Sequence, residues 1–165
     1  MKFVVSDGGR KAAGFPDCDG DCVVRALANA LNKPYAEMYH KFNNYCQANK
    51  HRWNVETVDV EKSVPIIFLR MFFWDCYEDV FFTDFLPPPT YCNKEKRFFA
   101  NPNRHTGVTL ADLPYMIAII KTKDHVTCMR SKWILDKKEI PEEQLGKINV
   151  ECYWKIGGSA RERSC

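Results

Sequence analysis

The sequence predicts an α+β fold, with helices in its first third and an antiparallel sheet in its last third. Two observations predict it. Apolar residues recur at helical spacing between residues 22 and 46, and short β-branched and aromatic runs separated by turn residues occupy residues 115–156. A chain of 165 residues is long enough for one domain with a real core and too short for two ordinary ones. We therefore expect one domain over residues 1–157 and a loose C-terminal tail over residues 158–165.

The balance of charge argues against a polyanionic partner. The 24 basic and 21 acidic residues leave a formal net charge of +3, which gives no strong field for nucleic acid or a membrane surface. The richest apolar stretch, residues 64–74, is interrupted by Arg70 and is too short to span a bilayer. Residues 1–9 contain no run of signal-peptide length, so we expect a cytoplasmic protein whose eight cysteines are free thiols.

Two helices are predicted in the first third. Residues before the first helix are rich in Gly and Asp and predict an irregular loop, at whose end Asp21 can cap a helix over residues 22–31. Residues 32–34, Asn-Lys-Pro, end this helix and begin the second. The two apolar stripes are Val23, Val24, Leu27, Ala28 and Leu31, and then Tyr35, Met38, Tyr39, Phe42 and Cys46.

The middle of the chain gives no clear periodicity. Residues 58–85 are rich in aromatic side chains, and the three prolines at 87–89 are expected to end this segment. Residues 101–107 are a turn-rich connection. The aromatic residues are most simply core, and the alternative is a partner-binding or substrate-binding surface over residues 68–85. The residues of this cluster are Phe72, Phe73, Trp74, Phe81 and Phe82.

The last third predicts a sheet. Residues 115–121 and 125–130 form an antiparallel hairpin around the turn at 122–124, and residues 133–136 and 150–156 supply two more strands. A two-residue turn at 131–132 would pair Arg130 with Trp133 and Thr127 with Asp136. Because side chains alternate along a strand, His125 and Thr127 share a face, so Asp136 becomes the diagonal neighbour of His125.

Cys22 and His125 are the candidate nucleophile and base. A thiol at a helix N-terminus lies at the positive end of the macrodipole, which lowers its pKa, and an imidazole can accept its proton. Asp136 would then orient the imidazole and stabilise its charged form. Each residue alone has a plainer interpretation: Cys22 as a buried thiol, His125 as a satisfied strand histidine, and Asp136 as a solvated carboxylate.

These residues resemble the papain-like cysteine peptidases, and most closely the small papain-fold proteins encoded by tailed phages. The resemblance lies in residues 21–27 (DCVVRAL), 33–35 (KPY) and 109–114 (TLADLP), then in His125-Val126 and Asp136. It implies a papain-like domain in which a helical lobe, opened by the nucleophile, packs on an antiparallel sheet. Residues 58–103 would be a family-specific insertion.

The resemblance also implies roles and a function. Cys22 would be the nucleophile and the donor of a backbone N–H to the oxyanion, His125 the general base and acid, and Asp136 the orienting residue. The protein would be a thiol hydrolase, a cysteine peptidase or isopeptidase, acting on a host or virion protein in the host cytoplasm. The alternatives are acyl transfer by the same chemistry and a papain-fold binding protein without catalysis.

One position departs from the papain-like pattern. Those enzymes usually carry a Gln a few residues before the nucleophile as an oxyanion donor, whereas this chain has Pro16, Asp17, Cys18 and Asp19 there. Loss of one such donor costs about 10²-fold or more in turnover. Acidic residues beside a thiol also oppose its ionisation.

The sequence gives little support for a metal-binding site. Residues 17–21 (DCDGD) are similar to a calcium loop, but the Gly is misplaced and Ala28 stands where an EF-hand has its Glu. A zinc site could combine Cys18 and Cys22 with a histidine, yet no pair has Cys-x-x-Cys spacing. The histidines available for it are His40, His51 and His105. We expect no metal and no cofactor.

Overall fold

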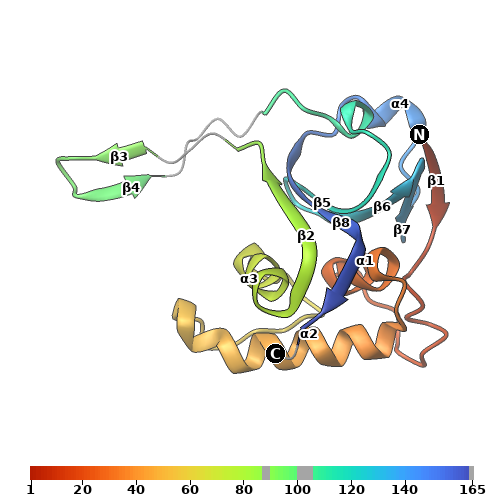
Figure 1. Cartoon of the computed structure of the whole chain (residues 1–165), viewed down its shortest axis with the longest axis horizontal. Helices are drawn as coiled ribbons and strands as arrows, with labels where there is room; N and C mark the ends of the chain where they lie inside the picture. Colours follow the sequence, from red (N-terminus) through yellow and green to blue (C-terminus); the bar gives the residue numbers. More distant parts are fainter. Residues whose placement is uncertain (87–89, 100–105, 164–165) are drawn as a thin grey trace.

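A computed structural model describes residues 1–86, 90–99 and 106–163. The fold is mixed α+β, as expected, and its centre is a six-stranded sheet in the order β1-β7-β6-β5-β8-β2 (Figure 1). The helices are α1 (Cys22–Leu31), α2 (Tyr35–Asn49), α3 (Ile66–Cys76) and α4 (Glu142–Leu145), with 3-10 helices η1 (Lys50–Trp53) and η2 (Leu110–Asp112). The sheet strands are β1 (Lys2–Val5), β2 (Tyr77–Asp84), β5 (Met116–Thr122), β6 (Val126–Ser131), β7 (Trp133–Asp136) and β8 (Val150–Glu162).

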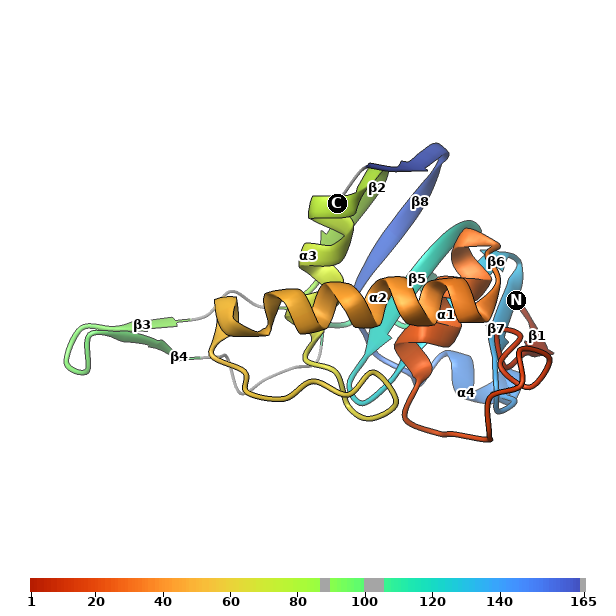
Figure 2. The same ribbon diagram turned by 90° about the horizontal axis from the view of Figure 1, so that it is seen from below.

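Helix α1 has the predicted bounds, and helix α2 begins within one residue of its predicted start. Helix α1 spans Cys22–Leu31 and ends at Asn32, which adopts the left-handed conformation (φ 52°) that an Asn tolerates better than most residues. Helix α2 begins at Tyr35, because Pro34 lies in extended backbone just before it. Figure 2 shows α2 crossing the helical side of the molecule next to α1.

Three elements that the sequence pattern did not predict lie at the edges of the sheet or beside it. Strand β1 lies within the expected loop and pairs in parallel with β7, whereas all other pairs of this sheet are antiparallel. The unassigned middle segment forms helix α3 and the edge strand β2. Within residues 58–103 the structure also has a separate two-stranded hairpin of β3 (Thr90–Cys92) and β4 (Arg97–Phe99), which lies apart from the main sheet (Figures 1 and 2).

Two expectations about the chain end and the cysteines are wrong. Residues 158–162, expected to belong to a loose tail, continue β8 and pair with the start of β2, since Glu78 lies opposite Arg161 and its carboxylate also accepts from that guanidinium. Residues 164–165 lie outside the described part. Among the described cysteines six are free thiols, but Cys76 forms a disulfide bond.

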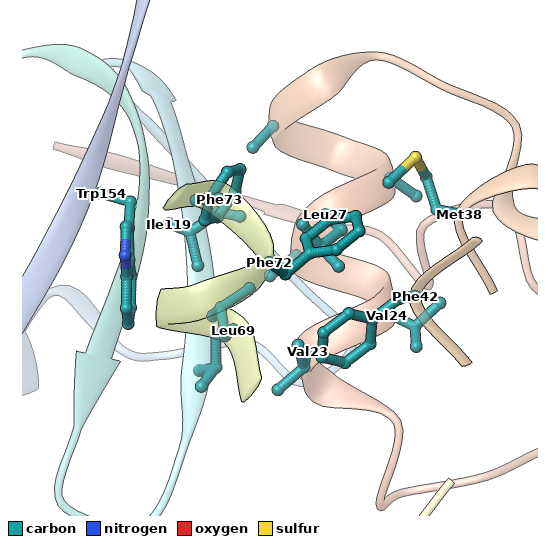
Figure 3. Close-up of a cluster of buried hydrophobic side chains, with 14 of the residues drawn as sticks. Val23, Val24, Leu27, Met38, Phe42, Leu69, Phe72, Phe73, Ile119 and Trp154 are labelled. Atoms are coloured by element: carbon teal, nitrogen blue, oxygen red, sulfur yellow. The ribbon is translucent and has the colours of Figure 1, made fainter. Parts of the chain in front are cut away.

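The alternation of side chains gives the sheet two apolar faces. Along β5, Ile119 faces helices α1, α2 and α3, whereas Ala118 and Ile120 face the opposite side, near η2 and α4. Figure 3 shows the helical face, where Phe72 of α3 lies near Leu27 and Phe42. The rings of Phe42 and Phe72 meet edge to face at 5.2 Å between centroids. Helix α3 therefore belongs to the main core.

The structure bears on the aromatic cluster and on the search for a membrane-spanning segment. In the aromatic cluster Phe72 and Phe73 are buried, whereas Trp74 is 76% and Phe81 57% exposed. The cluster is thus partly core and partly surface. No helix in the described ranges has both the length and the apolar composition to cross a bilayer.

Candidate active site

Cys22, His125 and Asp136 come together at one end of the sheet. His125 directly precedes β6 and Asp136 is the last residue of β7, and because these strands run antiparallel, the two residues share that end. The predicted register holds: Arg130 pairs with Trp133 across the turn, in which Ser131 has a positive φ of 55°. Helix α1 packs on β6, and its first residue, Cys22, lies against the same end.

His125 contacts both partners. Its Nε2 lies 2.5 Å from Asp136 Oδ2, and its ring is hydrogen-bonded to the side chain of Cys22. A carboxylate only accepts hydrogen bonds, so Nε2 carries a proton and Nδ1 is the atom left for the thiol. The backbone N–H of Val126 also donates to Cys22. The His125 ring therefore lies between the side chains of Cys22 and Asp136.

These contacts change the three pKa values. Burial alone raises the pKa of Cys22, but the hydrogen bond from His125, the Val126 N–H and the charges of His125 and Arg25 outweigh it, so that pKa is lowered. The hydrogen bond to Asp136 and then that to Cys22 raise the pKa of His125 to about 9, against the opposing effect of burial. For Asp136, burial raises the pKa, and the bond from His125 contributes most to a net lowering. The lowered pKa of Cys22 and the raised pKa of His125 favour a thiolate and imidazolium pair.

Asp21 does not cap helix α1 with its side chain, which corrects the prediction. It occupies the N-cap position with φ −92° and ψ 25°, but its carboxylate bonds to no N–H of the helix. The carboxylate is fully buried and accepts from the guanidinium of Arg25, from Tyr35 Oη at 2.6 Å and from Arg10 Nη1 at 3.3 Å. Two guanidinium groups compensate its charge better than one helix N–H would.

Arg25 links the segment before Cys22 to Asp136. Its guanidinium bonds to Asp21, the residue before Cys22, and its Nη2 lies 4.0 Å from Asp136 Oδ1. It is buried, with 4% of its surface exposed, so solvent screens these interactions weakly. One side chain thereby connects the start of α1 with the end of β7.

Arg10 extends this network to the loop on the other side of α1. Its Nη2 bonds to Glu61 Oε2 at 2.6 Å, and Glu61 also accepts from Tyr39 Oη at 2.8 Å. Gly20 lies so close to the backbone of Glu61 and Lys62 that a Cβ there would overlap the Glu61 carbonyl. The loop before Cys22 and the loop at residues 59–64 are therefore held against each other.

Lys137 binds two acidic residues of the segment where papain-like enzymes carry the Gln. Its Nζ lies 2.6 Å from Asp17 Oδ1 and 2.8 Å from Asp19 Oδ1, and these bonds lower the pKa of both carboxyl groups. The ammonium ion thus offsets part of the negative charge that would oppose thiolate formation at Cys22. The backbone N–H of Cys22 belongs to the first turn of α1, where N–H groups have no partner within the helix, so it can donate to an oxyanion.

A cleft of about 340 Å³ opens beside Cys22 and His125. Helix α1 contributes Cys22 and Val23, and one wall is the segment before α3 with its first residue. The opposite wall is the turn between β5 and β6. The wall residues are Lys62, Ser63, Val64 and Ile66 on one side and Lys121, Lys123, Asp124, His125 and Val126 on the other.

The described residues hold no cluster of three or more potential metal ligands among His, Cys, Asp and Glu. Cys22 is engaged with His125, and Cys18 Sγ lies 3.3 Å from the Glu61 carbonyl. The zinc alternative with His105 falls on a residue outside the described part.

Arg25, Arg10, Glu61 and Lys137 contribute to the site, and the sequence reasoning did not single them out. Only Arg25 had a local signal, because an acid four residues before a base on a helix is a favourable pair, here Asp21 and Arg25. The others reach the site from separate segments, so no spacing could indicate them. No family model, no curated protein and no solved structure matches this chain.

Proposed function

We propose that this protein is a papain-like thiol hydrolase, a cysteine peptidase or isopeptidase, with Cys22, His125 and Asp136 as its catalytic residues. The observation that carries the proposal is the contact of His125 with Cys22 on one side and, through Nε2 at 2.5 Å, with Asp136 on the other. The position of Cys22 at the N-terminus of α1 and the adjoining cleft support it.

The reaction follows from the protonation states that the site favours. The Cys22 thiolate attacks the carbonyl carbon of a peptide or isopeptide bond, and the N–H of Cys22 donates to the resulting oxyanion. The His125 imidazolium gives its proton to the leaving amine, the carbon–nitrogen bond breaks, and a thioester remains. His125 then takes a proton from water, which attacks the thioester, and the thiol and a carboxylic acid are released.

The resemblance to phage-encoded papain-fold proteins suggests the class of target. A host protein or a virion component in the host cytoplasm would be the substrate of such an enzyme. Hydrolysis and acyl transfer share the thioester, so incorporation of an added amine in place of water would identify the transferase alternative.

The test is the pH dependence of Cys22 alkylation by iodoacetamide, followed at each cysteine by mass spectrometry. We expect Cys22 to be alkylated at pH values well below the ordinary thiol pKa of about 8.5. In His125→Ala, we expect this reactivity at low pH to be lost. His51→Ala, a change at an exposed histidine of η1, is the matched control and should leave the profile unchanged. Cys22 reacting like Cys18 and Cys92 in the parent protein would contradict the proposal.

A papain-fold binding protein is the second candidate function, and two observations favour it. Residues 16–19 contain no Gln, and a second hollow of about 520 Å³ is lined by α3, β2 and β8 and includes the exposed Trp74. Cys22→Ala separates the two functions. A binding protein would keep its partner affinity and its biological effect, whereas a hydrolase would lose the effect and remain folded.

A further inference from the structure

The walls of the cleft beside Cys22 carry more positive than negative charge. Lys62 lies on the wall before α3, and Lys121 and Lys123 lie on the opposite wall, at the turn between β5 and β6. Asp124 is the one carboxylate among the described lining residues.

The three lysines differ in what already holds them. The ammonium group of Lys121 bonds to the carbonyl oxygens of Thr122 and Lys123, and it lies 3.4 Å from Glu151 Oε2. The Lys121 ammonium group therefore stabilises the turn, and the Glu151 carboxylate compensates its charge.

Lys62 and Lys123 remain available. The side chain of Lys62 is 82% exposed. Among the described residues its carboxylate neighbour is Asp59, which is 4.0 Å away and itself exposed, an arrangement that contributes little. Lys123 is exposed and pairs with no carboxylate in the described part of the chain. Two exposed lysines, neither held by a close ion pair, thus line the cleft from different segments.

Apolar groups also line the cleft. Val23, Val64, Ile66 and Val126 contribute aliphatic side chains to the same lining as the two lysines. A substrate side chain with an aliphatic stem and a terminal carboxylate matches this combination, because the stem can contact the apolar groups while the carboxylate reaches an ammonium ion.

We propose that the cleft selects peptide substrates with an acidic side chain, glutamate in particular, next to the carbonyl that Cys22 attacks, and that Lys62 and Lys123 determine this specificity. The inference rests on the proposed function, since it concerns the substrate of the same site. Neither lysine contacts the reacting atoms in the mechanism above, so removing them affects selection and leaves the thiol chemistry intact.

The experiment uses two acyloxymethyl ketone peptides that differ only in Glu or Gln next to the ketone. The rate of Cys22 labelling is measured by mass spectrometry in the parent chain, in Lys62→Gln/Lys123→Gln and in a control, Lys94→Gln/Lys147→Gln. The control removes two exposed lysines that do not line the cleft. Reactivity of Cys22 toward iodoacetamide is recorded for each protein as the independent measure of thiol activation.

We expect the Glu probe to label the parent about tenfold faster than the Gln probe, or about threefold for each exposed lysine. The double variant should lose this preference, the control should keep it, and 1 M salt should reduce it because salt screens exposed charges. Iodoacetamide reactivity should stay equal in all three proteins.

Three results would overturn the inference. Equal labelling by both probes at an activated Cys22 would refute the selection of acidic substrates and leave the hydrolase proposal standing. A Glu preference that survives in the double variant would refute the assignment to Lys62 and Lys123. No labelling by either probe, together with an iodoacetamide profile like that of Cys92, would refute the hydrolase proposal and this inference with it.

Discussion

Asp136→Asn removes the negative charge beside His125 and keeps the size of the side chain. Asp136 Oδ2 lies 2.5 Å from His125 Nε2, and this bond raises the pKa of His125 more than any other contact. The contact with Cys22 comes next, and burial opposes both, which leaves the pKa of His125 at about 9 instead of 6.5. The substitution therefore removes the main cause of that rise.

The magnitude can be bounded from the structure. A rise of this size corresponds to about 3 kcal/mol at most. Because the side chain of His125 is 39% exposed, screening by water reduces the effect to about 1–2 kcal/mol. We expect the pKa of His125 to fall by about one pH unit or more in Asp136→Asn. The pKa of Cys22 should rise, since a neutral imidazole stabilises a thiolate less well.

The assay is an NMR titration of the His125 ring protons together with the pH profile of Cys22 alkylation. Asp124→Asn is the matched control, because it removes an exposed carboxylate adjacent to His125 in sequence and leaves the Nε2 contact intact. An unchanged His125 pKa in Asp136→Asn would refute the reasoning, and so would an equal change in both variants.

Three further predictions concern stability, measured by urea unfolding. Asp21→Asn should cost about 3 kcal/mol at pH 7, because it leaves buried guanidinium groups without their carboxylate; a loss under about 1 kcal/mol would contradict this. Gly20→Ala should destabilise by about 1–3 kcal/mol through its clash with a backbone carbonyl, whereas Gly146→Ala, which meets open space, should not. In Cys22→Ala, the protonated His125 should stabilise the fold fully below pH 6.5. This stabilisation should disappear as the pH rises through the raised pKa of His125. A free energy of unfolding that increases between pH 6.5 and that pKa would contradict the prediction.

Local patterns were sufficient where the structure is determined by neighbours in sequence. The apolar spacing of residues 22–31 and the Asn-Lys-Pro that follows gave the bounds of α1, and the two-residue turn gave the register of Arg130 and Trp133. They failed for α3, whose residues are apolar on nearly every side, so no amphipathic period appears. They also failed for β1, which is a strand only because β7 lies beside it.

For the candidate site, the sequence by itself determined the residue types and one relation between them. Strand parity placed Asp136 on the face of His125, because alternation of side chains is a local property of strands. Only the tertiary structure decided that the start of α1 meets that end of the sheet. It also turned Asp21 inward, since the groups that bind it, Arg10 and Tyr35, come from other segments and compensate a buried charge that no local cap could hold.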